Sequence, residues 1–199
     1  MPQSSATFQR NLVSWRKFER ISQAALAAEL KVSQQAVSMW ERGADRPSPA
    51  KMAEIRALMA KTDPVRFELA FIRQQQSIRT LFDTDGVRMI GYSEGFAKVW
   101  PQFTRFENYA LEDHLVGEVA AMMGSREIRQ GIIGGEIAMA SGVSDRHANI
   151  DADTAFRHRW FVRFRRYGWR VVGDMVFEAC DPSTPTGIET LLRVDEITS

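Results

Sequence analysis

Apolar side chains recur every three or four residues through the first sixty positions, which is the spacing of one face of an α-helix. This spacing predicts helices over residues 8–18, 23–30 and 34–41, and a further helix that begins at Pro49. Each predicted helix has a narrow apolar stripe, and such stripes are buried by packing helices against one another. The first third of the chain is therefore predicted to be all-α.

Serine stands one residue before three of the predicted helices, at Ser22, Ser33 and Ser48, where its hydroxyl can accept a backbone N–H of the first turn. Gly43 follows the third helix, and glycine is favoured there because the chain leaves a helix in a left-handed conformation. A turn of three residues separates the second helix from the third. This pattern predicts a helix-turn-helix arrangement, although an ordinary helical bundle without a ligand would show it too.

Charge is distributed unevenly along the chain, although the net charge is +1. Residues 1–60 contain nine lysines and arginines against five acidic residues, whereas residues 61–156 contain ten against fourteen. A basic segment followed by an acidic one indicates two modules, the first of which faces a polyanion.

The segment that holds the serine caps also resembles a known family. Residues 22–49 read SQAALAAELKVSQQAVSMWERGADRPSP, which is similar to the DNA-binding domain of the Cro/repressor (Xre) family of bacterial and phage regulators. The resemblance extends over roughly residues 8–60 and implies a helix-turn-helix fold that binds DNA. It also implies a partly buried ion pair between Arg16 and Glu41. Trp40 departs from the family, which usually has a smaller side chain there, and this departure bears on packing.

Two adjacent glutamines, Gln34 and Gln35, open the third helix, which the resemblance identifies as the recognition helix. A glutamine amide can pair bidentately with N7 and N6 of adenine, so both are predicted to read bases in the major groove. Polar, apolar and cationic side chains around them complete the predicted DNA surface. The full set that we expect to contact DNA is Gln23, Ser33, Gln34, Gln35, Ser38, Met39, Arg42, Arg46 and Lys51.

The members of this set have different expected roles. Gln23 opens the second helix, where backbone N–H groups and an amide can hold a phosphate. Arg42, Arg46 and Lys51 are expected to hold phosphates and to make binding depend on salt. For Arg46 and Lys51, a solvated surface side chain is an equally good interpretation.

The rest of the chain predicts a different class of structure. Residues 77–93 predict a strand, an Asp-Gly turn and a second strand. Short helices follow, and residues 156–182 predict two long antiparallel strands with a turn near Tyr167 and Gly168. This order of elements resembles a PAS-type sensor domain. The expected fold class is thus an N-terminal all-α helix-turn-helix domain followed by a PAS-like α+β domain with an antiparallel sheet.

The expected domain boundaries follow from these elements. Residues 1–62 form the helix-turn-helix domain, 63–77 a connecting helix and 78–199 the α+β domain. A heptad-like seam starts in the connecting helix, with spacings of 4, 3, 4 and 3 residues that are typical of two packed helices. It consists of Phe67, Phe71, Gln74, Ile78 and Leu81. A helix that rests on its own domain, or one that ends near Gln76, fits these residues as well.

A run of six arginines in the last predicted strands is interleaved with aromatic residues, as in some nucleic-acid grooves. The run is Arg157, Arg159, Arg163, Arg165, Arg166 and Arg170. Alternation along a strand is the simpler interpretation, because Trp160 and Val162 would then share a packed face while Arg163 and Arg165 point to solvent.

Catalytic and metal-binding patterns are missing from the sequence. His114, His147 and His158 have no spacing that is typical of a metal site, and Cys180 is the single cysteine, as suits a reducing cytoplasm. No apolar run reaches the length of a membrane span or a secretory signal. We expect a cytoplasmic protein without catalytic residues, metal or cofactor, which leaves room for an unidentified ligand in the C-terminal domain.

The expected function is that of a sequence-specific transcriptional regulator that reads a pseudo-palindromic operator in double-stranded DNA as a homodimer. Repression is the commoner mode of the family. The C-terminal domain would then dimerise, or sense a small-molecule or protein effector. Two alternatives remain: an antitoxin-like module whose helix-turn-helix head binds a protein, and a small-molecule-binding enzyme with a DNA-binding head.

Overall fold

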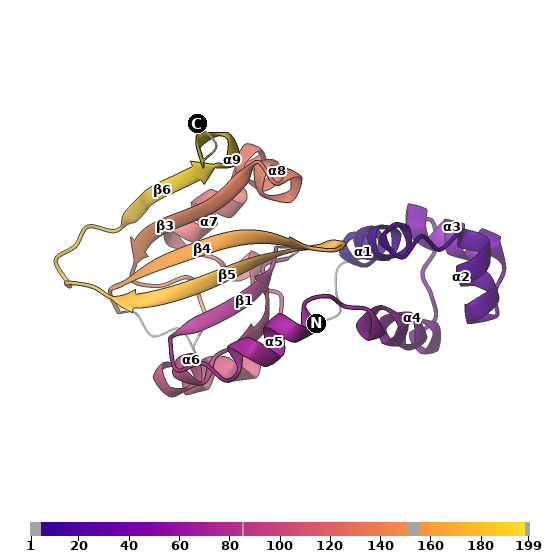
Figure 1. Cartoon of the computed structure of the whole chain (residues 1–199), viewed down its shortest axis with the longest axis horizontal. Coiled ribbons are helices and arrows are strands. Elements are labelled where there is room, and N and C mark those ends of the chain that lie inside the picture. Colours follow the sequence, from indigo (N-terminus) through magenta and orange to yellow (C-terminus); the bar gives the residue numbers. More distant parts are fainter. Residues whose placement is uncertain (1–4, 85, 151–155, 198–199) are drawn as a thin grey trace. The chain divides into compact units, whose positions relative to one another are not determined.

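The structure is a computed structural model, and it describes residues 5–84, 86–150 and 156–197. The chain divides into two compact units (Figure 1). The first consists of Met1–Arg66 with Tyr167–Arg170, and the second of Phe67–Arg166 with Val171–Ser199. The fold class expected from the sequence is confirmed, because helices form the first unit and a sheet with helices forms the second.

Four helices account for most of the described residues of the first unit, and they agree with the predicted ones to within a few residues at each end. They are α1 (Ser5–Phe18), α2 (Gln23–Leu30), α3 (Gln34–Arg42) and α4 (Pro49–Lys61). Their apolar stripes meet in one core, which consists of Phe8, Leu12, Trp15, Leu26, Ala27, Leu30, Val37, Trp40, Ile55 and Met59. Trp40 is accommodated in this core with 5% of its surface exposed.

The predicted caps fix where these helices begin and end. Ser22, Ser33 and Ser48 each accept a hydrogen bond from a backbone N–H three residues later, so an otherwise unpaired donor of each first turn is satisfied. Gly43 ends α3 in the left-handed conformation, with φ of 75°. Lys31 adopts the same conformation after α2 and turns the chain sharply towards α3.

The second unit is built on a six-stranded sheet of order β2-β1-β5-β4-β3-β6. Strand β1 pairs antiparallel with β2 and β5, and β3 pairs antiparallel with β4 and β6. The strands are β1 (Arg79–Asp83), β2 (Arg88–Tyr92), β3 (Ile137–Ser144), β4 (His158–Tyr167), β5 (Arg170–Ala179) and β6 (Gly187–Arg193). The order of a strand pair, helices and long antiparallel strands is the predicted one. Asp85, the first residue of the predicted Asp-Gly turn, lies outside the described residues.

Helices cover the sheet unequally. Between β2 and β3 the chain forms α6 (Glu94–Val99), the 3-10 helices η1 (Pro101–Phe106) and η2 (Glu112–His114), α7 (Gly117–Gly124) and α8 (Arg126–Gly134). Phe96 of α6, Met122 of α7 and Ile132 of α8 pack with Trp160 and Phe177 of the sheet, so the main core of this unit lies between these helices and one sheet face. A four-residue helix, α9 (Val194–Ile197), follows β6.

The predicted heptad seam is wrong. Helix α5 (Arg66–Ile72) ends before Gln74, and Leu81 lies fully buried in β1 between β2 and β5. Sheet pairing has overridden the helical spacing from Ile78 onwards. Phe67 and Phe71 remain on the helix, where 71% and 60% of their surfaces are exposed.

The arginine-rich strand follows the predicted alternation. Trp160 and Val162 are buried on the helix-covered face of β4, whereas Arg163 is exposed. On that opposite face Arg163 and Arg79 both donate hydrogen bonds to the buried carboxylate of Asp174, at 2.7 and 2.6 Å. The carboxylate of Asp174 on β5 is therefore linked to both neighbouring strands, β1 and β4.

Two helical glycines, Gly95 of α6 and Gly124 of α7, provide a matched test of how closely α6 approaches the backbone before β1. A methyl group at Gly95 would lie 2.0 Å from the carbonyl oxygen of Gln76, whereas one at Gly124 would meet no atom within 4 Å. We expect Gly95→Ala to lower the free energy of unfolding by about 2 kcal/mol or more, because a backbone atom has to move. Gly124→Ala should raise it by up to about 1 kcal/mol through helix propensity. Urea unfolding followed by circular dichroism measures both, and equal effects would contradict the close approach at Gly95.

Candidate functional sites

The first turn of α3 presents two amide side chains to solvent. Gln34 and Gln35 are exposed, and Ser33 before them caps the helix with its hydroxyl. Val37 and Trp40 of the same helix are buried in the core, with 0% and 5% of their surfaces exposed. The helix is thus anchored along one face, and both amides can contact a ligand without any change in packing.

The neighbouring predicted residues continue this surface. Ser38 and Met39, one turn along α3, are half-buried. Arg42 is exposed at the end of the helix, where its Nε donates to the carbonyl oxygen of Ser38 at 3.3 Å. Arg46 is exposed in the loop that follows. These side chains therefore extend the surface from the first turn of α3 to the loop before α4.

Lys51 has a structural contact of its own. Its Nζ donates to the carbonyl oxygen of Leu30 at 2.7 Å and lies 2.8 Å from the carboxylate of Glu54. The ammonium group thus satisfies a carbonyl at the end of α2, where a cation also suits the helix dipole.

Arg16 and Glu41 connect α1 to α3. The Arg16 guanidinium donates to both carboxylate oxygens of Glu41, at 2.6 and 2.9 Å, and also to the carbonyl oxygen of Ile21 at 2.8 Å. Gln23 at the start of α2 donates to the same carboxylate at 2.8 Å. Both charged side chains are largely buried, with 13% and 6% exposed. One carboxylate therefore joins three helices, and the amide of Gln23, expected at a phosphate, is directed to Glu41.

These contacts set the ionisation of Glu41. Burial raises the pKa of Glu41, but the hydrogen bonds from Arg16 and Gln23 outweigh it, so the pKa lies below its ordinary value. The hydrogen bond to Glu41 raises the pKa of Arg16 in turn. The stabilisation is therefore present above the ordinary pKa of a glutamate, and it is lost as the pH falls through the lower value of the folded state.

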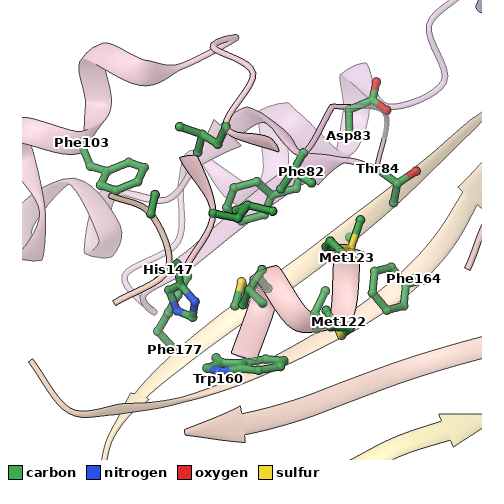
Figure 2. Close-up of a pocket in the computed structure, with 18 of the residues that line it drawn as sticks. Phe82, Asp83, Thr84, Phe103, Met122, Met123, His147, Trp160, Phe164 and Phe177 are labelled. Atoms are coloured by element: carbon green, nitrogen blue, oxygen red, sulfur yellow. The ribbon is translucent and has the colours of Figure 1, made fainter. Parts of the chain in front are cut away.

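The second unit contains a cavity between the helix-covered face of the sheet and the helices (Figure 2). Its volume is about 80 Å³, and its lining is rich in aromatic and thioether side chains such as Phe96, Met122, Trp160 and Phe177. The indole N–H of Trp160 donates to the hydroxyl of Ser144 at 2.9 Å. The cavity is thus mostly apolar, and no motif in the sequence indicates it.

A histidine pair lies at one end of the cavity. Nε2 of His147 and Nε2 of His158 are 2.7 Å apart, and Nδ1 of His158 is 2.9 Å from the carbonyl oxygen of Phe156. Because a carbonyl can accept but not donate, His158 carries its proton on Nδ1 when both rings are neutral. His147 then donates from Nε2, and its Nδ1 carries a lone pair. Burial and the neighbouring His158 lower the pKa of His147 to about 3, so its ring is neutral at pH 7.

The described ranges show neither a metal-type cluster nor a membrane span. Among these residues no three histidine, cysteine, aspartate or glutamate side chains come together as metal ligands would. No helix in the described part of the chain has the length and apolar character needed to cross a membrane.

Comparison with known proteins finds a family match within the first unit. Residues 15–62 match the model of the helix-turn-helix family, so this part of the chain is similar to helix-turn-helix domains of the Xre/Cro type. No curated protein matches the chain. Among solved structures, the chain is similar to a PAS domain from a two-component sensor histidine kinase, with 13% identity and a TM-score of 0.39. The match covers 57% of this chain and 93% of that one.

The buried carboxylate can be tested by its removal. Glu41→Ala leaves the guanidinium of Arg16 without its main partner, and we expect it to lower the free energy of unfolding by about 2–3 kcal/mol. Glu54→Ala is the matched control, since its pair with Lys51 is on the surface and contributes less than about 1 kcal/mol. Urea unfolding at pH 7 measures both variants. Equal small losses would show that Glu41 does not connect the helices.

The histidine pair predicts acid sensitivity. The pKa of His147 is about 3 in the folded chain and about 6.5 when unfolded, so the unfolded state binds more protons between these values. Stability should therefore fall as the pH drops below 6.5, by up to about 1.4 kcal/mol per pH unit from this group. Urea unfolding at pH 7.5, 6 and 5 should show a smaller slope for His147→Gln than for wild type, and identical slopes would rule out the depressed pKa.

Proposed function

We propose that the chain is a sequence-specific transcriptional regulator, and that it reads double-stranded DNA through the helix that begins Ser33-Gln34-Gln35. The observation that supports this most is the exposure of both amides on a helix anchored by Val37 and Trp40. A glutamine amide offers one donor and one acceptor side by side, which matches N7 and N6 of adenine in the major groove. Arg16 and Gln23 donate hydrogen bonds to Glu41 on α3 and so link this helix to α1 and α2. The orientation of α3 within the head would therefore be set before DNA binds.

Other residues of the surface would position the head on the duplex. We propose base or thymine-methyl contacts for Ser38 and Met39, and phosphate contacts for Arg42, Arg46 and Lys51. The backbone N–H groups at the N-terminal ends of α2 and α3 would add further phosphate contacts, and Ser33 lies at the N-terminal end of α3. Since the side chain of Gln23 holds Glu41, the phosphate contact proposed for the start of α2 falls mainly to its backbone.

We further propose a homodimer on a pseudo-palindromic operator. A single head of four short helices buries little DNA surface, so tight binding needs a second head. Two reading helices would lie in successive major grooves, with half-sites centred about 10 bp apart or a multiple of this. The second unit would provide dimerisation, sensing of an effector, or both. We propose repression as the mode, because occupation of an operator blocks a promoter without further contacts, and the cytoplasm as the compartment.

Selection of bound duplexes from a random pool tests the proposal. Wild type should enrich a pseudo-palindromic motif, and the double variant Gln34→Ala, Gln35→Ala should enrich none. Each lost bidentate contact should reduce discrimination by about 1–3 kcal/mol. Gln130→Ala, an exposed glutamine on α8, is the matched control and should keep the motif. The same motif from the double variant would contradict base reading by these glutamines, and a head that binds a protein instead of DNA would enrich nothing from wild type.

The arginine after the reading helix should behave differently. Arg42→Ala should weaken binding to specific and random duplexes alike. The plot of log K against log salt has a negative slope, and its magnitude should fall by about 1, as expected for one lost phosphate contact. Fluorescence anisotropy between 50 and 200 mM salt measures the slope. A change of preferred sequence without a change of slope would assign Arg42 to base reading.

A further inference from the structure

The cavity of the second unit has the features of a site for one small molecule. Its apolar walls come from α6, α7, β4 and β5, and its polar side chains are few. Figure 2 shows His147 at one end and Asp83 with Thr84 at the other, separated by rings and methionine side chains. Ligand sites of proteins are commonly of this kind, mostly apolar with a small number of placed polar groups.

The size of the cavity limits what can enter. Its volume of about 80 Å³ is about half that of the ~150 Å³ engineered cavity that binds benzene. Met122, Met123 and Met175 line it, and the unbranched, flexible side chain of methionine can move to admit a slightly larger molecule. A molecule of about five or six heavy atoms is therefore the expected size, and large ring cofactors are excluded.

Charge and hydrogen bonding limit the ligand further. An ion would lose its water among the aromatic rings, which costs far more than the apolar contacts return. A neutral ligand can instead use His147, whose Nδ1 carries a lone pair in the tautomer that the bond to His158 selects. The matching ligand group is an N–H or an O–H.

We propose that this cavity binds a small uncharged molecule with an apolar, preferably aromatic body and one N–H or O–H group, which donates a hydrogen bond to His147. This site deepens the sensing role proposed above for the second unit, and it rests on that role for its biological purpose. Its test does not involve DNA. A chain that binds the ligand and selects no duplex would refute the regulator and leave the cavity site intact.

Three five-membered rings serve as probes of the full chain. Pyrrole is neutral, aromatic and has an N–H, thiophene lacks the N–H, and pyrrolidine has nearly the same size but is a cation at pH 7. We expect pyrrole to shift the indole N–H resonance of Trp160 saturably, with a dissociation constant of about 1 mM, a reasonable affinity for so few atoms. Thiophene should bind at least fivefold more weakly than pyrrole, by the rough worth of one hydrogen bond. Pyrrolidine should cause no saturable shift.

Variants locate the binding. Ala148→Leu fills the cavity from its wall and should abolish pyrrole binding, whereas Ala179→Leu, on the exposed end of β5, should leave it unchanged. His147→Phe keeps a ring of similar size and should bring the affinities for pyrrole and thiophene within about twofold of each other, since the hydrogen bond is lost. Val119→Phe, which enters the cavity from α7, replaces Ala148→Leu if thermal unfolding shows that the latter does not fold.

The outcomes decide the proposal. The absence of a saturable shift with pyrrole would overturn it and leave a packing void. Binding of pyrrolidine as tight as that of pyrrole would overturn the neutral ligand class. Pyrrole binding that survives both cavity-filling variants would place the molecule elsewhere on the chain.

Discussion

The buried ion pair between Arg16 and Glu41 is the contact on which the proposed DNA-reading surface depends. It holds the end of α3 against α1, and the amide of Gln23 adds α2 to the same carboxylate. Short helices of eight and nine residues have little stability of their own, so their directions come from such tertiary contacts. Because the carboxylate is paired on both oxygens, the cost of its burial is offset, and the first turn of α3 is left free to meet a ligand.

The second unit also combines buried ion pairs with apolar packing. The ion pairs lie on one face of its sheet, and the apolar core lies on the other. Asp174 accepts from Arg79 and Arg163 on one face, while Trp160 and Phe177 pack with the helices on the other. The cavity lies on the apolar face of the sheet, between aromatic side chains of β4 and β5 and the helices α6 and α7. A void in such a place costs packing energy, which a ligand of matching shape would return.

The first unit was predictable because local signals and tertiary contacts agree there. Serine caps, Gly43 and the apolar stripes each indicate the helix ends that the structure shows. The seam from Phe67 to Leu81 misled because two local patterns overlap there: the helical spacing runs past Ile78 into residues that also predict a strand. Pairing of β1 with β2 and β5 decides for the strand. Strand β6 was missed as well, since none of its residues from Gly187 to Arg193 is fully buried and buried and exposed side chains do not alternate along it. The histidine pair joins His147, which follows β3, to His158, the first residue of β4, and a separation of 11 residues is not the spacing of a known motif, so the sequence carried no signal for it.

Reading of bases by Gln34 and Gln35 is most directly tested by nuclear magnetic resonance of the full chain with the duplex that it selects. The side-chain amide resonances of both glutamines should shift with that duplex and stay unchanged with a scrambled one. The indole resonance of Trp40, buried behind them, should move little in either case, because the helix is already fixed in place. Unshifted glutamine amides on a saturated specific duplex would contradict base reading by α3 and assign recognition to another surface.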